Sequence, residues 1–465
     1  MTNDMTNGRP LGIIVRFMIP MCLGNIFQQL YNLADSIIAG QFIGVDALAA
    51  IGATSALMFF VTGWLQGLAS GFAILVAQWF GAKKLDVMRH YVAMSIYLMA
   101  AFSVVMTVGL EIANIPILHL MNSPGNLIGD IGAYMGVIYA GLFVTSAYNF
   151  LAAVLRALGD SKSPLYFLMI SAAINVVLDI VFIVQFDMGV AGCAYATVIA
   201  QAISALLCLI YVIKKFPILH LKREDFRISA RSMAKLLGLG IPMGLQFSIT
   251  ALGTIIVQGA VNVYGAVYIA GFSAASKMQN IIATVFASFG ATVATFVGQN
   301  RGAGKMDRVR SGVCCTQWMI LGWSVVMMAA IYLFGKYMVL LFISSSEKQV
   351  IDAAVIYFRT VAWCYPFLGC IFLYRNALQG MGNGIVPMLG GVFELLARAG
   401  IVLIVSGRTG FAGVCLTDPA AWIAALIPLV PFYFYAMRKA LKKVRYEEKT
   451  LVQPASARCS RGFTV

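Results

Sequence analysis

Four carboxylates stand inside long apolar stretches of this sequence and could do chemistry there: Asp35, Asp179, Glu394 and Asp418. A charged carboxylate within a membrane-spanning helix costs about 2.5–3.5 kcal/mol on insertion scales. Each of these acids is therefore expected to pair with a basic group, to bind an ion or to exchange protons.

Two of the acids share a helix face with a neutral oxygen ligand. Tyr31 lies one helical turn before Asp35, and Asn175 lies one turn before Asp179. Counted along their helices, these residues and Thr197 all lie roughly 8–12 Å below the same membrane surface. Oxygen ligands around two carboxylates suit a hard cation such as Na⁺, whereas paired carboxylates in a low dielectric could carry H⁺ instead. A hydrogen-bonded cluster that only joins the helices is the structural alternative.

The other intramembrane charges have simpler explanations. Glu394 and Arg398 are one turn apart in the favourable acid-first order, which favours an ion pair within one helix over a substrate contact. Lys277 could either face a central cleft or serve the structure. Asp418, just before Pro419, fits the first turn of a helix.

No catalytic group is predicted, and no metal site beyond Na⁺ at the cation site. Three histidines occur, all at or beyond the ends of apolar stretches and without ligand spacing. A nucleotide motor is excluded as well, because the segment GQNRGAGKM at 298–306 has one residue too many between its glycines and lacks the Ser/Thr of a P-loop. We expect neither an enzyme nor a cofactor.

The elements that must position these residues are membrane-spanning helices. Of 465 residues, 61% are hydrophobic and 11% charged, and the mean hydropathy of +0.87 excludes a soluble domain of this size. About twelve stretches are long enough to cross a bilayer. We predict an all-α polytopic membrane protein with spans near 12–40, 47–80, 90–115, 127–156, 164–186, 189–213, 236–264, 267–299, 311–335, 350–379, 385–406 and 411–437.

The net charge of +15 reflects topology rather than nucleic-acid binding, since the basic residues lie in short loops and at one terminus. With the N-terminus inside, most of the 33 Lys and Arg residues fall in cytoplasmic segments. We therefore expect both termini in the cytoplasm.

An internal repeat divides the chain into two halves. The stretch QWFGAKKLDVMR at 78–89 returns as QNRGAGKMDRVR at 299–310, IPM at 19–21 returns at 241–243, and LGDSKSP at 158–164 returns as MGNGIVP at 381–387. Each half holds six spans, so the repeats are parallel, and such transporters carry substrate between their halves. We predict an N-lobe at 1–213, a cytoplasmic linker at 214–235, a C-lobe at 236–440 and a disordered cytoplasmic tail at 441–465, with a V-shaped central cleft between two pseudo-symmetric lobes. Taken alone, the repeated loops could also be helix-capping turns.

Several of these motifs together resemble the multidrug and toxic compound extrusion (MATE) family. They are YNLADSIIAGQFIG at 31–44, the paired loops VAQWFGAKK and VGQNRGAGK, and NVVLD at 175–179. The chain is most similar to the DinF-like bacterial and archaeal branch, which implies an N-lobe cation site formed by Asp35, Tyr31, Asn175, Asp179 and Thr197. The NorM-like branch has acidic ligands in its C-lobe, where Glu394 is the deep acid available here.

The resemblance implies an antiporter in a bacterial or archaeal cell membrane that exports cationic lipophilic drugs against Na⁺ or H⁺. We expect a monomer whose partners are these small molecules and the lipid bilayer. A flippase for lipid-linked oligosaccharide or peptidoglycan precursors is the alternative; it would need basic residues in the cleft, where Lys277, Arg375 and Arg398 are available. An integral membrane enzyme, a receptor and a scaffold are remote alternatives.

Overall fold

The computed structural model describes residues 4–43, 45–120, 125, 127–340, 347–404 and 410–452, with side chains for all of them except 32–37, 39, 45–53, 55, 56, 120, 445 and 447–452. Every regular element in this part of the chain is a helix. The predicted all-α class is therefore confirmed. The side chain of Asp35 lies outside the description, although its backbone belongs to the first helix.

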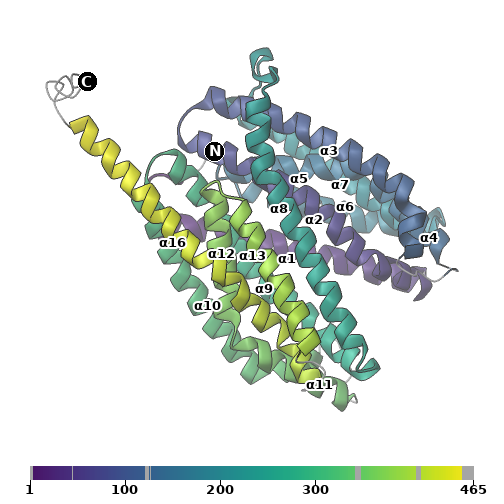
Figure 1. Cartoon of the computed structure of the whole chain (residues 1–465). Coiled ribbons are helices and arrows are strands. Elements are labelled where there is room, and N and C mark those ends of the chain that lie inside the picture. The colour runs from purple at the N-terminus through teal and green to yellow at the C-terminus, as the bar shows by residue number, and fades with distance from the viewer. Residues whose placement is uncertain are drawn as a thin grey trace.

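The first lobe contains seven α-helices and one π-helical turn (Figure 1). They are α1 (Pro10–Phe42), α2 (Val45–Gly81), α3 (Leu85–Leu120), α4 (Ile128–Ala140), α5 (Leu142–Ala157), α6 (Lys162–Ile180), the π-helical η1 (Val181–Gln185) and α7 (Gly189–Lys215). Two short 3₁₀ turns, η2 (Pro217–Leu219) and η3 (Arg223–Phe226), connect this lobe to the next.

The second lobe follows the same plan. It consists of α8 (Ala230–Asn262), α9 (Ala266–Gly302), α10 (Met306–Leu340), α11 (Lys348–Ala362), α12 (Tyr365–Gly380), α13 (Ile385–Ile404), α15 (Phe411–Cys415) and α16 (Thr417–Val452). Because α16 continues to Val452, the tail predicted to be disordered from 441 begins as helix.

The described residues contain ten membrane-span candidates, or up to twelve if each of two bent helix pairs forms one span. The bent pairs are α4 with α5, at 49°, and α11 with α12, at 56°. They hold the fourth place in one lobe and the corresponding place in the other. The internal repeat seen in the sequence is thus a repeat of shape as well, and the expected number of about twelve spans is confirmed.

Glycines let the two lobes touch along α2 and α8. A Cβ atom added to Gly67 would lie 2.7 Å from the Cα of Gly244, and one added to Gly71 would lie 2.6 Å from the Cα of Gly240. Apolar helices gain no hydrophobic driving force within a bilayer, so close backbone packing through small residues is a main way for them to associate. The α2–α8 contact is therefore the main seam between the lobes.

The duplicated loops meet each other at one end of this seam. A Cβ atom on Gly81, the last residue of α2, would lie 1.9 Å from the carbonyl oxygen of Gln299. A Cβ atom on Gly302, the last residue of α9, would lie 1.8 Å from the carbonyl oxygen of Gln78. The repeated motif thus forms a reciprocal contact between the lobes, in which each glycine admits the backbone of the other repeat.

A short N-terminal segment, residues 4–9, crosses the same end of the molecule. We call it the strap, and the end it covers the strap end. Lys83 of the first lobe forms an ion pair with Asp4, with 2.7 Å between Nζ and Oδ2. From the second lobe, Gln299 Oε1 accepts a hydrogen bond from the Met5 amide (2.9 Å), and the Arg308 guanidinium donates to two carbonyl groups of the strap (2.8 and 3.1 Å). The strap therefore ties both lobes together where they touch.

The helices α4 and α11 lie at the far end of the molecule, one in each lobe (Figure 1). The helices α1, α6 and α7 carry the residues of the candidate site, and they pack together within the first lobe. Whether 1–213 and 236–440 fold as separate domains remains a prediction.

Candidate functional site

The centre of the candidate site is one face of α6. Asn175 and Asp179, one turn apart, both have 0% exposed surface. The helix is held against α7 by Ser171, whose hydroxyl donates to the carbonyl of Ala200 (2.8 Å). The α-helix ends at Ile180, the residue after Asp179, and continues as the π-helical η1, a feature often found at functional sites.

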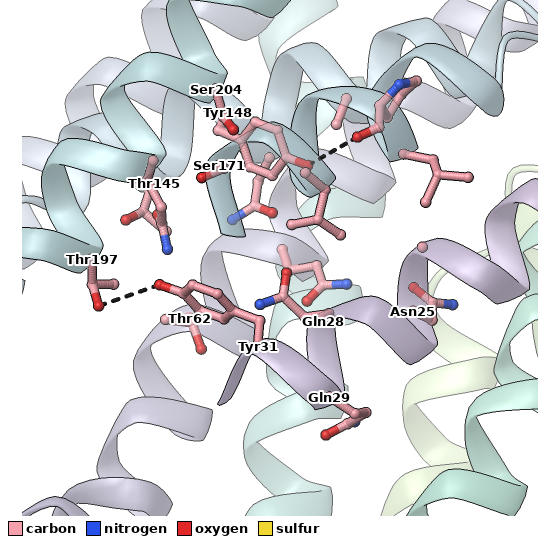
Figure 2. A pocket seen from close by; sticks show the side chains of 18 of the residues that line it. Asn25, Gln28, Gln29, Tyr31, Thr62, Thr145, Tyr148, Ser171, Thr197 and Ser204 are labelled. Carbon is pink, nitrogen blue, oxygen red and sulfur yellow. Dashed lines mark hydrogen bonds between the residues drawn. The ribbon is translucent and has the colours of Figure 1, made fainter. Parts of the chain in front are cut away.

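Thr197 joins three helices at this point. Its hydroxyl oxygen accepts a hydrogen bond from the Tyr31 hydroxyl of α1 at 3.3 Å and one from Asn175 Nδ2 of α6 at 3.5 Å. Figure 2 shows Tyr31 and Thr197 pointing toward each other. Within the described side chains, Asn175 Oδ1 accepts no hydrogen bond. The structure thus brings Tyr31, Asn175 and Thr197 together, with Asp179 on the same face of α6.

A cavity of about 520 Å³ opens beside this cluster within the first lobe (Figure 2). Tyr31 and Thr197 belong to its wall, whereas Asn175 and Asp179 are not among its described lining residues. Much of the wall is polar but neutral, because it carries amide and hydroxyl side chains from α1, α2, α5, α6 and α7. These include Asn25, Gln28, Gln29, Thr62, Gln66, Thr145, Asn149, Ser171, Gln201 and Ser204.

One charged side chain, Arg156, lines this cavity among the described residues. The sequence placed it among the cytoplasmic basic residues, because it falls at the very end of a predicted span. In the structure it occupies the last turn of α5 and is half-buried. Its position at a span boundary does not predict from the sequence that its side chain lines a cavity within the lobe.

The charges of the second lobe pair differently from the prediction. Glu394 is hydrogen-bonded to Arg375 of α12, and Arg398 donates to Asp418 of α16 at 3.1 Å. The expected ion pair between Glu394 and Arg398 is therefore wrong. The physical reason is that α12 and α16 pack against the same face of α13 and offer each side chain a partner across the helix interface.

Asp418 is also more than the first-turn acid of α16. It accepts a second hydrogen bond from the hydroxyl of Tyr357, at 2.7 Å. Two acids and two arginines thus form a balanced set within the second lobe. Lys277, in contrast, is exposed on α9 and takes part in no described ion pair.

The histidines do not gather into a metal site. His90 contacts Asp225 O and Ser232 Oγ at 3.0 and 3.1 Å, and so joins α3 to η3 in the connection between the lobes and to the first turn of α8. Among the residues that the structure describes, no group of three His, Cys, Asp or Glu side chains could hold a metal ion.

Two repeated bundles of apolar helices, with a buried carboxylate beside a polar cavity, define a multi-pass membrane protein with the architecture of a secondary transporter. The MatE family model matches the chain twice, at residues 20–181 and 242–403. The two matches are displaced by 222 residues at both boundaries, which agrees with the internal repeat. The chain belongs to the MATE family of efflux transporters.

Known proteins agree with this assignment over nearly the whole length. The probable multidrug resistance protein YpnP of Bacillus subtilis is 30% identical over 444 residues, covering 94% of this chain and 98% of that protein. A protein of Shewanella oneidensis named FAD transporter is 22% identical, covering 92% and 95%. The fold also matches a structure titled outward-facing conformation of a multidrug resistance MATE family transporter, with a TM-score of 0.88, 22% identity and coverage of 94% and 98%.

Proposed function

We propose that this protein is a cation-coupled antiporter that exports lipophilic drugs by alternating access between its two lobes. The observation that carries the proposal is the chain of contacts from Tyr31 through Thr197 to Asn175. This chain connects the wall of the cavity to the α6 face that bears the buried Asp179. A change of charge at the acid can therefore act on the cavity wall.

The coupling ion would be held by oxygen atoms. The carboxylate of Asp179, the amide oxygen of Asn175 and the hydroxyl groups of Tyr31 and Thr197 are the donor set that Na⁺ prefers, and Asp35 would add a second carboxylate. H⁺ is the other possibility, because protonation also neutralises a carboxylate that is buried away from water. Either ion would neutralise Asp179 when it binds.

Neutralising Asp179 would shift the balance between two arrangements of α1. This helix carries Tyr31 at the cluster, and it also carries Asn25, which lines the cavity and donates to Ser288 of the second lobe at 3.0 Å. A movement of α1 that follows ion binding would thus change the cavity wall and a contact between the lobes together. In this way ion and drug would exchange rather than bind together.

We infer that the strap end faces the cytoplasm, because the basic loops that the positive-inside rule assigns to that side lie there. In this state the strap and the glycine contacts hold the strap end closed. The conformation would then be one that is shut to the cytoplasm.

A flippase of pyrophosphate-linked precursors is less well supported. Two of the basic residues available for a pyrophosphate, Arg375 and Arg398, are already paired with carboxylates in the second lobe. The third, Lys277, is exposed on α9 and belongs to no ion pair among the described residues, and outside this set Arg156 lines the first-lobe cavity.

The proposal is tested with purified protein in proteoliposomes, in which a Na⁺ gradient and a pH gradient are imposed separately and ethidium transport is followed. Asp179→Asn keeps the shape of the side chain and removes its charge, and Asp187→Asn changes an exposed acid in the loop after the same helix. We expect one gradient to drive transport in the wild type and in Asp187→Asn, and neither to drive it in Asp179→Asn. Gradient-driven transport that persists in Asp179→Asn would refute the ion site, and no transport by the wild type under either gradient would refute the function.

A further inference from the structure

We propose that Arg156 binds a carboxylate of the exported molecule, so that the first-lobe cavity prefers dipolar substrates with an acidic group at one end. This inference rests on the proposed function, because it names the class of substrate that the cavity accepts. It differs from the expectation of purely cationic drugs.

Arg156 lines the cavity and has no hydrogen-bond or ion-pair partner among the described residues. It lies in the last turn of α5. Arg375, Arg398 and Arg308 are all bound to carboxylates or to backbone and amide oxygens. A half-buried guanidinium has five donors to satisfy, so leaving it unpaired inside an apolar bundle is costly unless a ligand supplies the acceptor.

The carboxylate nearest in sequence is already occupied. Asp160 Oδ1 accepts the backbone amides of Lys162 and Ser163 at 3.1 and 3.0 Å, at the start of α6. Its Oδ2 accepts the hydroxyl groups of Ser163 and Tyr211 at 2.6 and 3.3 Å. The carboxylate of Asp160 therefore stabilises the turn between α5 and α6 through these hydrogen bonds. It forms no described ion pair with Arg156, whose guanidinium lines the cavity.

The two ends of the cavity differ in charge. Arg156 lies beside the start of α6, where Ser161 and Pro164 also line the cavity, whereas Asp179 lies near the end of the same helix. At 1.5 Å per residue these places are about 20 Å apart. A basic group thus marks one end of the cavity, and the buried acid lies behind the other.

The space between the ends suits a drug-sized molecule with aromatic and polar groups. A volume of about 520 Å³ is typical of sites for drug-sized ligands. Tyr134 and Tyr148 offer aromatic surface, and Gln28, Asn149 and Gln201 offer amides that both donate and accept. A guanidinium binds a carboxylate through two parallel hydrogen bonds, so the acidic end of a ligand would be fixed in orientation as well as in place.

The test uses rhodamine B, which carries a free carboxylate, and its ethyl ester, which lacks the acid but has the same ring system. Binding is measured by fluorescence anisotropy with the purified full chain, and efflux is measured in proteoliposomes. Because a charge-assisted pair is lost, Arg156→Gln is expected to weaken binding of the acid by about tenfold or more and to change binding of the ester by less than about twofold. Arg156→Lys should retain part of the preference, since it keeps the charge but loses the two-pronged geometry.

Lys162→Gln is the matched control, because it removes one positive charge from an exposed side chain at the same end of the first lobe. It should leave both dyes unaffected. Equal losses for acid and ester in Arg156→Gln, or no loss for either, would overturn the role of Arg156. Transport of the ester alone by the wild type would also overturn it while leaving the efflux function intact, whereas transport of neither dye would count against the function itself.

Discussion

Adding one methyl group at the contact between the duplicated loops should drive the lobes apart at the strap end. In Gly81→Ala the new Cβ would start 1.9 Å from the carbonyl oxygen of Gln299, and in Gly302→Ala it would start 1.8 Å from that of Gln78. Real Cβ atoms essentially never approach another atom within 3.0 Å, so the backbones must separate by more than 1 Å. Neither glycine has a positive φ, so alanine is tolerated by the backbone itself.

The size of the effect follows from this overlap. Forcing an extra methyl group into a close-packed contact costs about 1–3 kcal/mol. Because the overlap arises only where the lobes touch, it should raise the free energy of the closed state of the strap end. The folding of either lobe should be unaffected. Such a penalty shifts the equilibrium toward the state open at this end by a factor of about 5–150.

The assay is a distance measurement between spin labels on Ala82 and Ala303, which follow the two glycines, in a variant whose nine native cysteines are replaced. Gly81→Ala and Gly302→Ala should each lengthen the distance and lower efflux. Gly109→Ala and Gly322→Ala are the controls, because a Cβ atom at these helical positions meets nothing within 4 Å. Distances and efflux in the seam variants that match those of the controls would refute the idea that this contact closes the strap end.

Three further outcomes follow from the contacts of the strap and of the second lobe. Arg308→Ala removes the hydrogen bonds to two strap carbonyls and should speed hydrogen exchange of residues 4–9 without lowering the melting temperature by more than a few degrees. Asp4 is partly buried, which raises its pKa, but hydrogen bonds from Lys83 and the strap outweigh this and lower the pKa to about 2. Its contribution to strap docking should therefore be constant above the unfolded pKa of 3.8 and disappear as the pH falls through 2. The energy is small because the pair is exposed. Protection of the strap amides, corrected for the intrinsic exchange rate at each pH, that already changes between pH 5 and 8 would contradict this prediction. Glu394→Gln should destabilise the detergent-solubilised protein by about 3–5 kcal/mol because it leaves Arg375 buried and unpaired. The double change Glu394→Leu with Arg375→Met removes both charges and should restore most of the melting temperature. Equal stabilities of the single and double variants would contradict the pairing.

The fold was largely predictable because each of its main features leaves a strong mark in the sequence. Long apolar stretches give the spans, and the returning segments at 78–89 and 299–310 give the duplication. What those segments do was not predictable from one half alone. Each glycine is needed because the carbonyl of the other repeat approaches it, and that approach exists only once both lobes are folded.

Part of the candidate site was predictable, because contacts within one helix follow from the spacing of its residues. Residues one turn apart on a helix must share a face, so Asn175 and Asp179 were placed together by spacing alone. Partners from other helices were harder to infer. The pairing of Arg398 with Asp418 depends on how α13 and α16 pack, and the inward turn of Arg156 depends on a cavity formed by several helices. Spacing predicts contacts within a helix well, but contacts between helices depend on packing.

The most direct test of the central claim is whether the coupling ion and the drug compete through Asp179. Equilibrium binding of ethidium to the purified protein would be measured as Na⁺ is added at constant pH and as the pH is lowered without Na⁺, in the wild type, Asp179→Asn and Asp187→Asn. The account predicts that one of the two ions weakens dye binding in the wild type and in Asp187→Asn, and that this dependence is absent in Asp179→Asn. Two results would contradict the role of Asp179: dye affinity in the wild type that changes with neither ion, or dye affinity in Asp179→Asn that changes with the ion as much as in the wild type.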